Sequence, residues 1–254
     1  MQVISFPNTR VQTGALILVN SEHGYWAEDT QSLVSVQEQT PAIQMQHRAV
    51  ALLSKLMEDM QGWQHIVPVS GWRSFQEQQE IWDQSVAESG LEFTKKYVAL
   101  PGHSEHQTGL AIDLGLKQET IDFICPEFPY SGICQVFREK AAQYGFIERY
   151  PAGKESITGI GHEPWHFRYV GIPHASIIRR MDLTLEEYHM FLKQFPYGKR
   201  PYIHRTERST LEISYLSVDA YNTETICLAP KTPYTISGNN MDGFIITVWK
   251  DRSL

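Results

Sequence analysis

Residues 104–113 of this 254-residue chain, together with Glu163 and His166, constrain the fold more than any other part of the sequence. They offer two imidazoles and one carboxylate as ligands, from His106, His166 and Asp113, and they leave Glu163 as a spare acid. A catalytic zinc site needs three protein ligands of this nitrogen and oxygen kind, with a fourth position open for water. The sequence therefore predicts a metal centre that joins two separate stretches of the chain.

The alternation within residues 109–114 predicts a half-buried strand, because small or polar residues at the odd positions alternate with apolar residues at the even ones. His106 lies an odd number of residues before Asp113, so one straight strand would place the two side chains on opposite faces. The chain must therefore bend near Gly109, as glycine permits. A second alternating strand is predicted over residues 165–169, with its histidine on the polar side. Two adjacent strands could then direct all three ligands at one point.

Two further side chains are candidates for catalysis. Arg73 is predicted at the corner between a short edge strand and a helix that begins at Ser74, where Ser74 and Glu77 have the spacing of a capping box. A guanidinium fixed there could stabilise a tetrahedral oxyanion; the alternative is a buried ion pair that joins helix and sheet. Glu163 is not needed as a ligand, so it can take a proton from water and pass it to the departing amine. The alternative for Glu163 is a carboxylate that orients a ligand histidine.

The pattern Ser-x-His-x-x-Gly-x-Ala-x-Asp followed by Glu-x-Trp-His resembles the signature of the zinc D,D-peptidases of the VanY and VanX kind. The likeness is closest to the VanXY-type enzymes of vancomycin resistance, which combine D,D-dipeptidase and D,D-carboxypeptidase activity. No part of the signature is missing. The resemblance implies Zn²⁺ on His106, Asp113 and His166, with a catalytic base at Glu163.

The function that this resemblance implies is zinc-dependent hydrolysis of D-Ala-D-Ala, as the free dipeptide or as the end of a peptidoglycan precursor peptide. Gln78 and Ser104 are then expected to hold the free carboxylate of the substrate. From the residues alone, Gln78 could equally be a solvated helix residue and Ser104 a turn former. Two alternatives stay open: a peptidoglycan L-alanyl-D-glutamate endopeptidase on the same fold, and a zinc-stabilised binding module without turnover, like the similar Hedgehog domain. Glu163 and Arg73 speak against the binding module.

The fold class expected is α+β, in which helices flank a small antiparallel central sheet that carries the zinc site, similar to Hedgehog domains and D,D-peptidases. Residues 1–197 are expected to form the catalytic domain. The stretch 195–201, which contains prolines and a glycine, marks the boundary. Beyond it, a β-rich C-terminal subdomain is expected, assigned to residues 198–254. This extension could serve dimerisation, substrate gating or stability, so a homodimer is one expectation. Residues 117–131 contain prolines and aromatic residues, which indicates a loop beside the site.

The composition, 42% hydrophobic and 20% charged residues, is that of an ordinary globular protein. A formal net charge of −7 argues against nucleic acid as a partner, because phosphate binding needs a basic surface. The apolar run at residues 15–19 is too short for an export signal or a membrane span. The three cysteines are odd in number and widely spaced, which favours reduced thiols. The expected location is therefore the cytoplasm.

Overall fold

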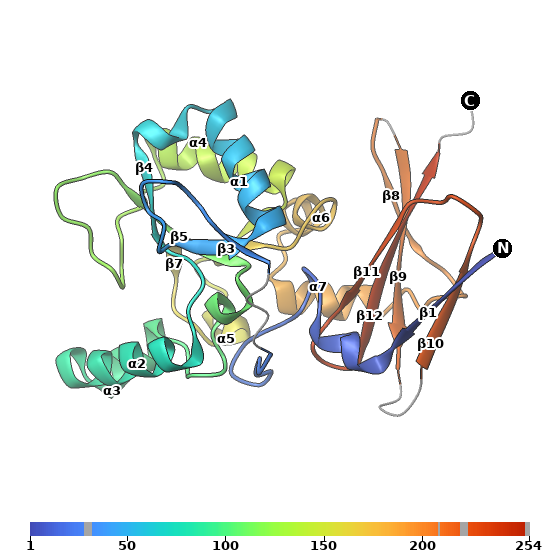
Figure 1. Ribbon diagram of the computed structural model, residues 1–254, viewed down its shortest axis with the longest axis horizontal. Coiled ribbons are helices and arrows are strands. Elements are labelled where there is room, and N and C mark those ends of the chain that lie inside the picture. The colour runs from blue at the N-terminus through green and yellow to red at the C-terminus, as the bar shows by residue number, and fades with distance from the viewer. Residues whose placement is uncertain (28–31, 208, 219–222, 252–254) are drawn as a thin grey trace. The chain divides into compact units, whose positions relative to one another are not determined.

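The computed structural model describes residues 1–27, 32–207, 209–218 and 223–251. The chain forms two compact units, a larger one of Val19–Thr184 and a smaller one that combines Met1–Leu18 with Leu185–Leu254 (Figure 1). This differs from the expected division into residues 1–197 and 198–254. The N-terminal segment belongs to the smaller unit because its strand pairs antiparallel with a strand near the other end of the chain, a long-range contact that no local pattern predicts.

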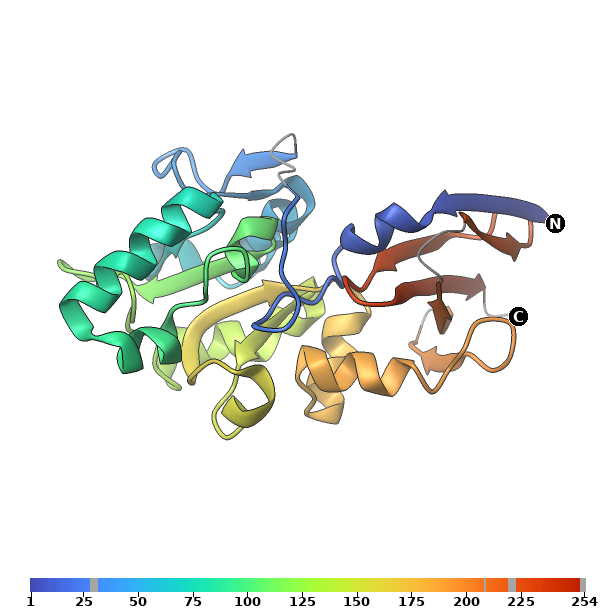
Figure 2. The ribbon, with the colours of Figure 1, turned by 90° about the horizontal axis from the view of Figure 1, so that it is seen from below.

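The larger unit is built on an antiparallel sheet with the strand order β4-β5-β7-β6 (Figure 2). Its strands are β4 (Ile66–Ser70), β5 (Ala111–Leu116), β6 (Phe146–Tyr150) and β7 (Glu163–Tyr169), and a separate pair consists of β2 (Leu33–Ser35) and β3 (Gln44–Gln46). β4 lies at the edge, as Pro68 requires, because proline has no backbone N–H to donate to a second neighbour. The central antiparallel sheet expected from the sequence is confirmed.

Helices surround this sheet. They are α1 (His47–Asp59), α2 (Phe75–Ser89), α3 (Leu91–Tyr97), α4 (Gly132–Ala141), α5 (Glu155–Thr158) and α6 (His174–Met181), with 3-10 turns η2 (Gly62–Gln64), η3 (Glu105–Thr108) and η4 (Ala142–Tyr144). The predicted capping box opens α2: the Ser74 hydroxyl accepts from the Glu77 N–H at 3.1 Å, and the Glu77 carboxylate accepts from the Ser74 N–H at 2.7 Å. In Figure 1, α1 and α4 lie on one side of the sheet and α2 and α3 on the other.

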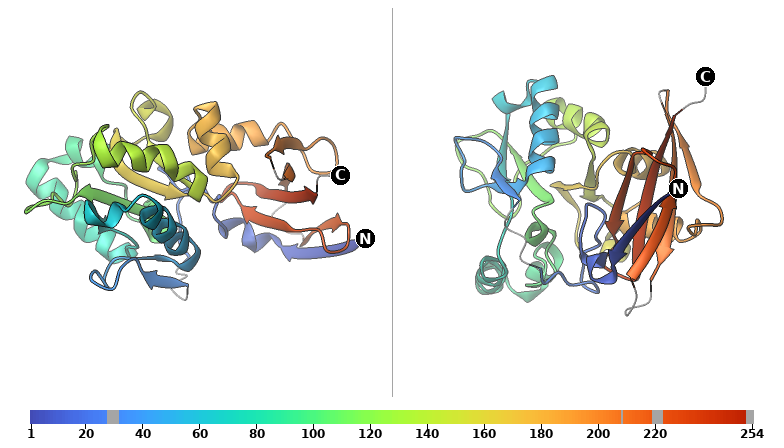
Figure 3. Two further views of the ribbon diagram at one scale, coloured as in Figure 1. Left: turned by 90° about the horizontal axis from the view of Figure 1, so that it is seen from above. Right: turned by 45° about the vertical axis from the view of Figure 1, so that its right-hand side comes forward.

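The two faces of the sheet have different chemistry. Phe167 of β7 pairs with Ile112 of β5, and the Phe167 ring packs edge-on against Phe137 of α4 at 4.7 Å between ring centroids. Neighbouring residues along a strand point to opposite faces, so the next registered pair, Asp113 and His166, faces away from α4. Figure 3 gives two further views of this arrangement. The sheet therefore presents an apolar face to α4 and a polar face on the side of α2.

The smaller unit is rich in strands, as expected for the C-terminal extension. It contains a sheet of order β11-β12-β9-β8, a strand pair β1-β10, a 3-10 turn and a helix. The elements are β1 (Gln2–Pro7), η1 (Asn8–Gln12), α7 (Leu185–Leu192), β8 (Tyr202–Arg205), β9 (Ser209–Ser217), β10 (Thr223–Leu228), β11 (Tyr234–Gly238) and β12 (Gly243–Asp251). Buried side chains from β1, β10 and β12, among them Phe6, Ile226 and Phe244, form its core. No helix among the described residues is both long and apolar enough to cross a bilayer.

Candidate metal centre

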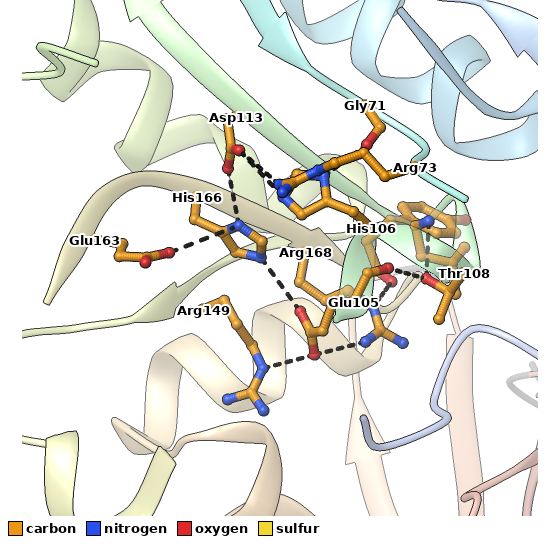
Figure 4. A network of polar contacts seen from close by, with 12 residues as sticks. Gly71, Arg73, Glu105, His106, Thr108, Asp113, Arg149, Glu163, His166 and Arg168 are labelled. Atoms are coloured by element: carbon orange, nitrogen blue, oxygen red, sulfur yellow. Dashed lines mark hydrogen bonds and ion pairs between the residues drawn. The ribbon is translucent and has the colours of Figure 1, made fainter. Parts of the chain in front are cut away.

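Three buried side chains converge on the polar face of the larger unit's sheet (Figure 4). The Nε2 of His106 lies 3.1 Å from Oδ2 of Asp113, and the Nδ1 of His166 lies 2.9 Å from Oδ1 of the same carboxylate. One ligand atom from each residue lies within 4.8 Å of the other two. The structure thus brings together the three residues that the sequence predicted as metal ligands.

Local backbone geometry directs His106 and Asp113, the two ligands from residues 104–113, to the same point. His106 lies in η3, and the chain then passes through Gly109, whose φ of 67° is in the left-handed region, before β5 begins. This bend allows His106 and Asp113 to face the same point despite their odd separation. A Cβ at Gly109 would also lie 2.7 Å from the Leu33 side chain. Glycine is therefore favoured here chiefly for its backbone conformation.

The histidines have the hydrogen-bond pattern that a metal ligand needs. The Nδ1 of His106 lies 2.6 Å from the Gly71 carbonyl oxygen, to which it can only donate, so its Nε2 carries the lone pair. The Nε2 of His166 lies 3.4 Å from Oε2 of Glu105, an acceptor that similarly leaves Nδ1 for the centre. The available nitrogens and the Asp113 carboxylate form a three-ligand nitrogen and oxygen set, which fits a catalytic zinc ion.

Glu163 lies on the same side of the sheet as His166, although the two residues are three positions apart. In a regular strand an odd separation places side chains on opposite faces. The register of β6 with β7 shifts here: Tyr150 pairs with Glu163 and Glu148 pairs with Phe167, so two steps along β6 match four along β7. The start of β7 is therefore irregular, and the Glu163 carboxylate lies at the centre, with its Oε2 3.9 Å from Nδ1 of His166.

Glu105 connects the centre to two buried arginines, a network that sequence reasoning missed. Its Oε1 accepts from Nε of Arg149 at 2.8 Å and from Nη1 of Arg168 at 2.7 Å, and its Oε2 faces His166. The three side chains of this ion cluster are fully buried. One signal was present in the sequence: Arg168 follows His166 by two residues in a predicted strand, so it shares the polar face and needs an acidic partner there.

Arg73 lies beside the ligands, and the predicted substrate residues lie near it. Its Nη1 donates to Oε1 of Gln78 at 3.0 Å and its Nη2 to Oδ2 of Asp113 at 3.4 Å. Within the described part of the chain, the buried Nε of Arg73 has no hydrogen-bond partner. The Gln78 amide also donates to the Ala99 carbonyl at 2.8 Å, so it holds Arg73 in place. Ser104 is buried, and it lines the same pocket as the ligands, Arg73 and Gln78.

The protonation states of the centre follow from burial and charge. Burial raises the pKa of Glu163 to about 8. Burial alone would lower the pKa of His166, but hydrogen bonds to Asp113 and Glu105 raise it to about 9. Burial and the nearby Arg73 charge lower the pKa of His106 to about 4. At pH 7 the metal-free centre therefore holds protons on His166 and Glu163 and none on His106.

Zinc binding at pH 7 is expected to release about one proton from His166, because a metal ligand must be deprotonated, and up to about one more from Glu163, whose pKa a nearby cation lowers. Since the pKa of His166 is about 9 in the metal-free protein, release from this residue falls as the pH rises through 9. Calorimetric titration with zinc in buffers of different ionisation enthalpy measures the proton count. The Glu163→Gln variant should lose only the second contribution. Zinc binding at pH 7 without proton release would contradict the assigned protonation states.

Comparison with known proteins places this geometry in a family. Residues 42–172 match VanY, D-alanyl-D-alanine carboxypeptidase. The bifunctional D-Ala-D-Ala dipeptidase and D-Ala-D-Ala carboxypeptidase VanXYC of Enterococcus gallinarum is 55% identical over 127 residues, which cover 50% of this chain and 67% of that protein. A D-alanyl-D-alanine carboxypeptidase of Enterococcus faecium is 34% identical over 254 residues, covering 94% of this chain and 77% of its own length.

Solved structures show the same relationship. The vancomycin resistance D,D-dipeptidase VanXYg, in complex with a D-Ala-D-Ala phosphinate analog, superposes with a TM-score of 0.95 at 44% identity, covering 98% of this chain and 99% of that one. The vancomycin resistance D,D-pentapeptidase VanY, in complex with Zn(II), has a TM-score of 0.59 at 33% identity over 69% of this chain and 98% of its own. The sequence and the structure agree on one conclusion: this chain belongs to the VanY family of D-alanyl-D-alanine carboxypeptidases.

Proposed function

We propose that this protein is a zinc-dependent D,D-peptidase that splits the D-Ala-D-Ala dipeptide and removes the terminal D-alanine from peptidoglycan precursor peptides. The observation that carries the proposal is the placement of Glu163, 3.9 Å from the Nδ1 of His166, in one pocket with all three ligands. A purely structural zinc site has no need of a free carboxylate beside its ligands. Relatives named as D-Ala-D-Ala dipeptidases and carboxypeptidases of vancomycin resistance support the same substrate and role.

His106, Asp113 and His166 would hold the zinc ion. When bound there, zinc polarises a substrate carbonyl and lowers the pKa of a water ligand toward ~7. Asp113 also accepts a hydrogen bond from Arg73, so the guanidinium is held in a fixed position relative to the metal ligands. The chain's own contribution is to hold both ligand histidines by their outer nitrogens, through Gly71 and Glu105, so that no rotation competes with metal binding.

Glu163 acts as the general base and then as the general acid. Its carboxylate takes a proton from the attacking water, and it delivers that proton to the amine nitrogen of the departing D-alanine as the peptide C–N bond breaks. Burial favours this double role, because a carboxylate whose pKa is raised by burial can both bind and return a proton near neutral pH.

Arg73 stabilises the negative charge that develops on the carbonyl oxygen, and Gln78 and Ser104 bind the carboxylate of the terminal D-alanine. Arg73 keeps a second N–H on each of its Nη atoms beyond the hydrogen bonds to Gln78 and Asp113, and the Gln78 amide keeps one N–H beyond its bond to Ala99; these are the donors that we assign to the substrate. Both side chains are held by each other and by the Ala99 carbonyl, so little reorganisation accompanies binding.

The Arg73→Lys variant is expected to lower kcat by ~10²-fold, because a lysine supplies a charge without the fork of donors that fixes the oxyanion. KM should change little. Steady-state kinetics on the dipeptide measure both parameters, and zinc competition serves as the control for an intact centre. If the substitution instead weakens zinc binding or folding while kcat stays the same, Arg73 is only a buried ion-pair partner of Asp113.

The function itself is tested by D-alanine release. Purified zinc-loaded protein should liberate D-alanine from the free dipeptide and from a pentapeptide that ends in D-Ala-D-Ala, and a chelator should stop the reaction until zinc is restored. Comparing the two substrates with one preparation gives the balance of dipeptidase and carboxypeptidase activity. The proposal fails if both substrates stay intact, or if the protein cuts an L-alanyl-D-glutamate bond instead.

The place of action that we propose is the cytoplasm, where peptidoglycan precursors are made. Cys125, Cys134 and Cys227 are all free thiols, a state that reducing compartments maintain.

A further inference from the structure

The start of β7 is an irregular backbone segment that needs support from outside the sheet. Glu163 and Phe167 are four steps apart on β7, while their partners on β6 are only two steps apart. Pro164 has no N–H to donate to a neighbouring strand, so the ladder is interrupted at the residue after Glu163. The proposed catalytic base therefore sits on backbone that the sheet alone does not fix.

Arg138 of α4 supplies that support. Its Nη2 donates to the Pro164 carbonyl at 2.7 Å, and its Nε donates to Oε2 of Glu148, on the neighbouring strand β6, at 2.8 Å. The same guanidinium donates to the carbonyls of Phe128 at 2.6 Å and Pro129 at 2.7 Å. The Arg138 side chain is only 8% exposed, so these contacts are screened from water. One group thus ties β6, β7 and the end of the loop 117–131 together.

The residue before Glu163 is tied to the same cluster. Tyr130 stacks on His162 with ring centroids 5.7 Å apart, and its hydroxyl hydrogen-bonds with Nε2 of His162 at 2.7 Å. The Tyr130 hydroxyl also donates to Glu148, the acceptor that Arg138 uses. The Arg138 guanidinium lies 3.9 Å above the Tyr130 ring, a cation–π contact. The backbone is therefore held on both sides of Glu163, through His162 before it and Pro164 after it.

We infer that Arg138 is a positioning residue for Glu163: by binding the Pro164 carbonyl it maintains the irregular backbone segment that carries the base beside the metal ligands. This inference rests on the proposed function, in which Glu163 moves the proton. Arg138 is not among the residues that line the pocket, and its contact with the segment that carries Glu163 is to the Pro164 carbonyl, so it acts through the backbone. Lysine cannot replace it, because an ammonium lacks the planar fork that reaches a carboxylate and three carbonyls together.

The Arg138→Lys variant is expected to lower kcat about 10–100-fold, since small displacements of a catalytic group have effects of this size. KM and zinc affinity should stay within about twofold, because the contacts that hold the substrate donors and the metal ligands do not involve Arg138. Hydrogen–deuterium exchange in peptides covering 160–170 should rise in both the metal-free and the zinc-loaded protein. Arg179→Lys is the matched control, because Arg179 also donates to a backbone carbonyl, that of Glu139, but outside this cluster.

A double-mutant cycle with Glu163→Gln separates positioning from a general structural role. If Arg138 acts through Glu163, adding Arg138→Lys to Glu163→Gln should leave the residual rate unchanged. If the two losses multiply, or if Arg138→Lys lowers zinc affinity as much as kcat, the inference is overturned. Failure of the proposed function looks different: the unmodified zinc-loaded protein would then release no D-alanine from either substrate.

Discussion

Replacing Glu163 with glutamine is expected to lower kcat by ~10²–10⁴-fold, the range in which a positioned general acid–base contributes. Glutamine keeps the shape of the side chain, but it neither accepts the water proton nor donates one to the leaving amine. Zinc binding should be retained, because Glu163 lies 3.9 Å from the Nδ1 of His166 and is not one of the three convergent ligands. Steady-state kinetics on the dipeptide, together with the zinc content of the same preparation, measure both results.

The matched control for Glu163→Gln is Glu155→Gln. Glu155 lies in α5 at an exposed position, so the same chemical change there should leave kcat and zinc binding unaltered. A variant of Glu163 that loses zinc along with activity would support the alternative reading, in which this carboxylate orients His166. A variant that keeps both zinc and full turnover would show that Glu163 is not the general base of the reaction.

The convergence of the proposed metal ligands could be predicted from the sequence because the features that direct them are local. The alternation through Asp113 gives the face of β5, and the odd spacing from His106 requires a bend that Gly109 provides. The start of α2 is equally local, because the capping box at Ser74 satisfies backbone donors within one turn. Patterns of this kind depend on neighbours in the sequence, and tertiary packing does not override them here.

The geometry of Glu163 could be predicted only in part. The sequence places it at the start of the second strand, but a strand with period two would turn it away from His166. The backbone is irregular instead: Pro164 interrupts the ladder, the register with β6 shifts, and Arg138 from a separate helix binds the Pro164 carbonyl. The pairing of β1 with β10 escaped prediction for the same reason, since a six-residue strand carries no signal for a partner at the far end of the chain.

Glu105 is the clearest example of a residue whose role is invisible in sequence. It lies between Ser104 and the ligand His106, within the very signature that identifies the site, yet its partners come from two other strands. Arg149 belongs to β6 and Arg168 to β7, and both reach the same carboxylate oxygen. Only the assembled sheet shows that this acid is buried between two guanidinium groups and a ligand histidine.

Replacing Glu105 with glutamine is therefore expected to lower the free energy of unfolding of the metal-free protein by ~3–5 kcal/mol, because it removes the buried carboxylate that two guanidinium groups share. Arg149 and Arg168 are fully buried, and His166, whose pKa is about 9, adds a third positive charge at pH 7. Urea unfolding of the metal-free variant at pH 7 measures this loss. Glu92→Gln is the control, since Glu92 forms only an exposed pair with Lys95 and should leave unfolding unchanged.

The same substitution should weaken zinc binding ~10–100-fold, the usual effect of removing a carboxylate that orients a ligand histidine. Two causes act together: Nε2 of His166 loses its carboxylate acceptor, and the loss of the Glu105 charge makes the centre more positive, which disfavours a divalent cation. Adding Arg149→Met to Glu105→Gln separates the two effects. The double variant should regain stability because it buries one charge fewer, yet its zinc affinity should stay below that of the unmodified protein because the acceptor is still missing. Full recovery of zinc affinity in the double variant would mean that Glu105 balances charge and does not orient His166.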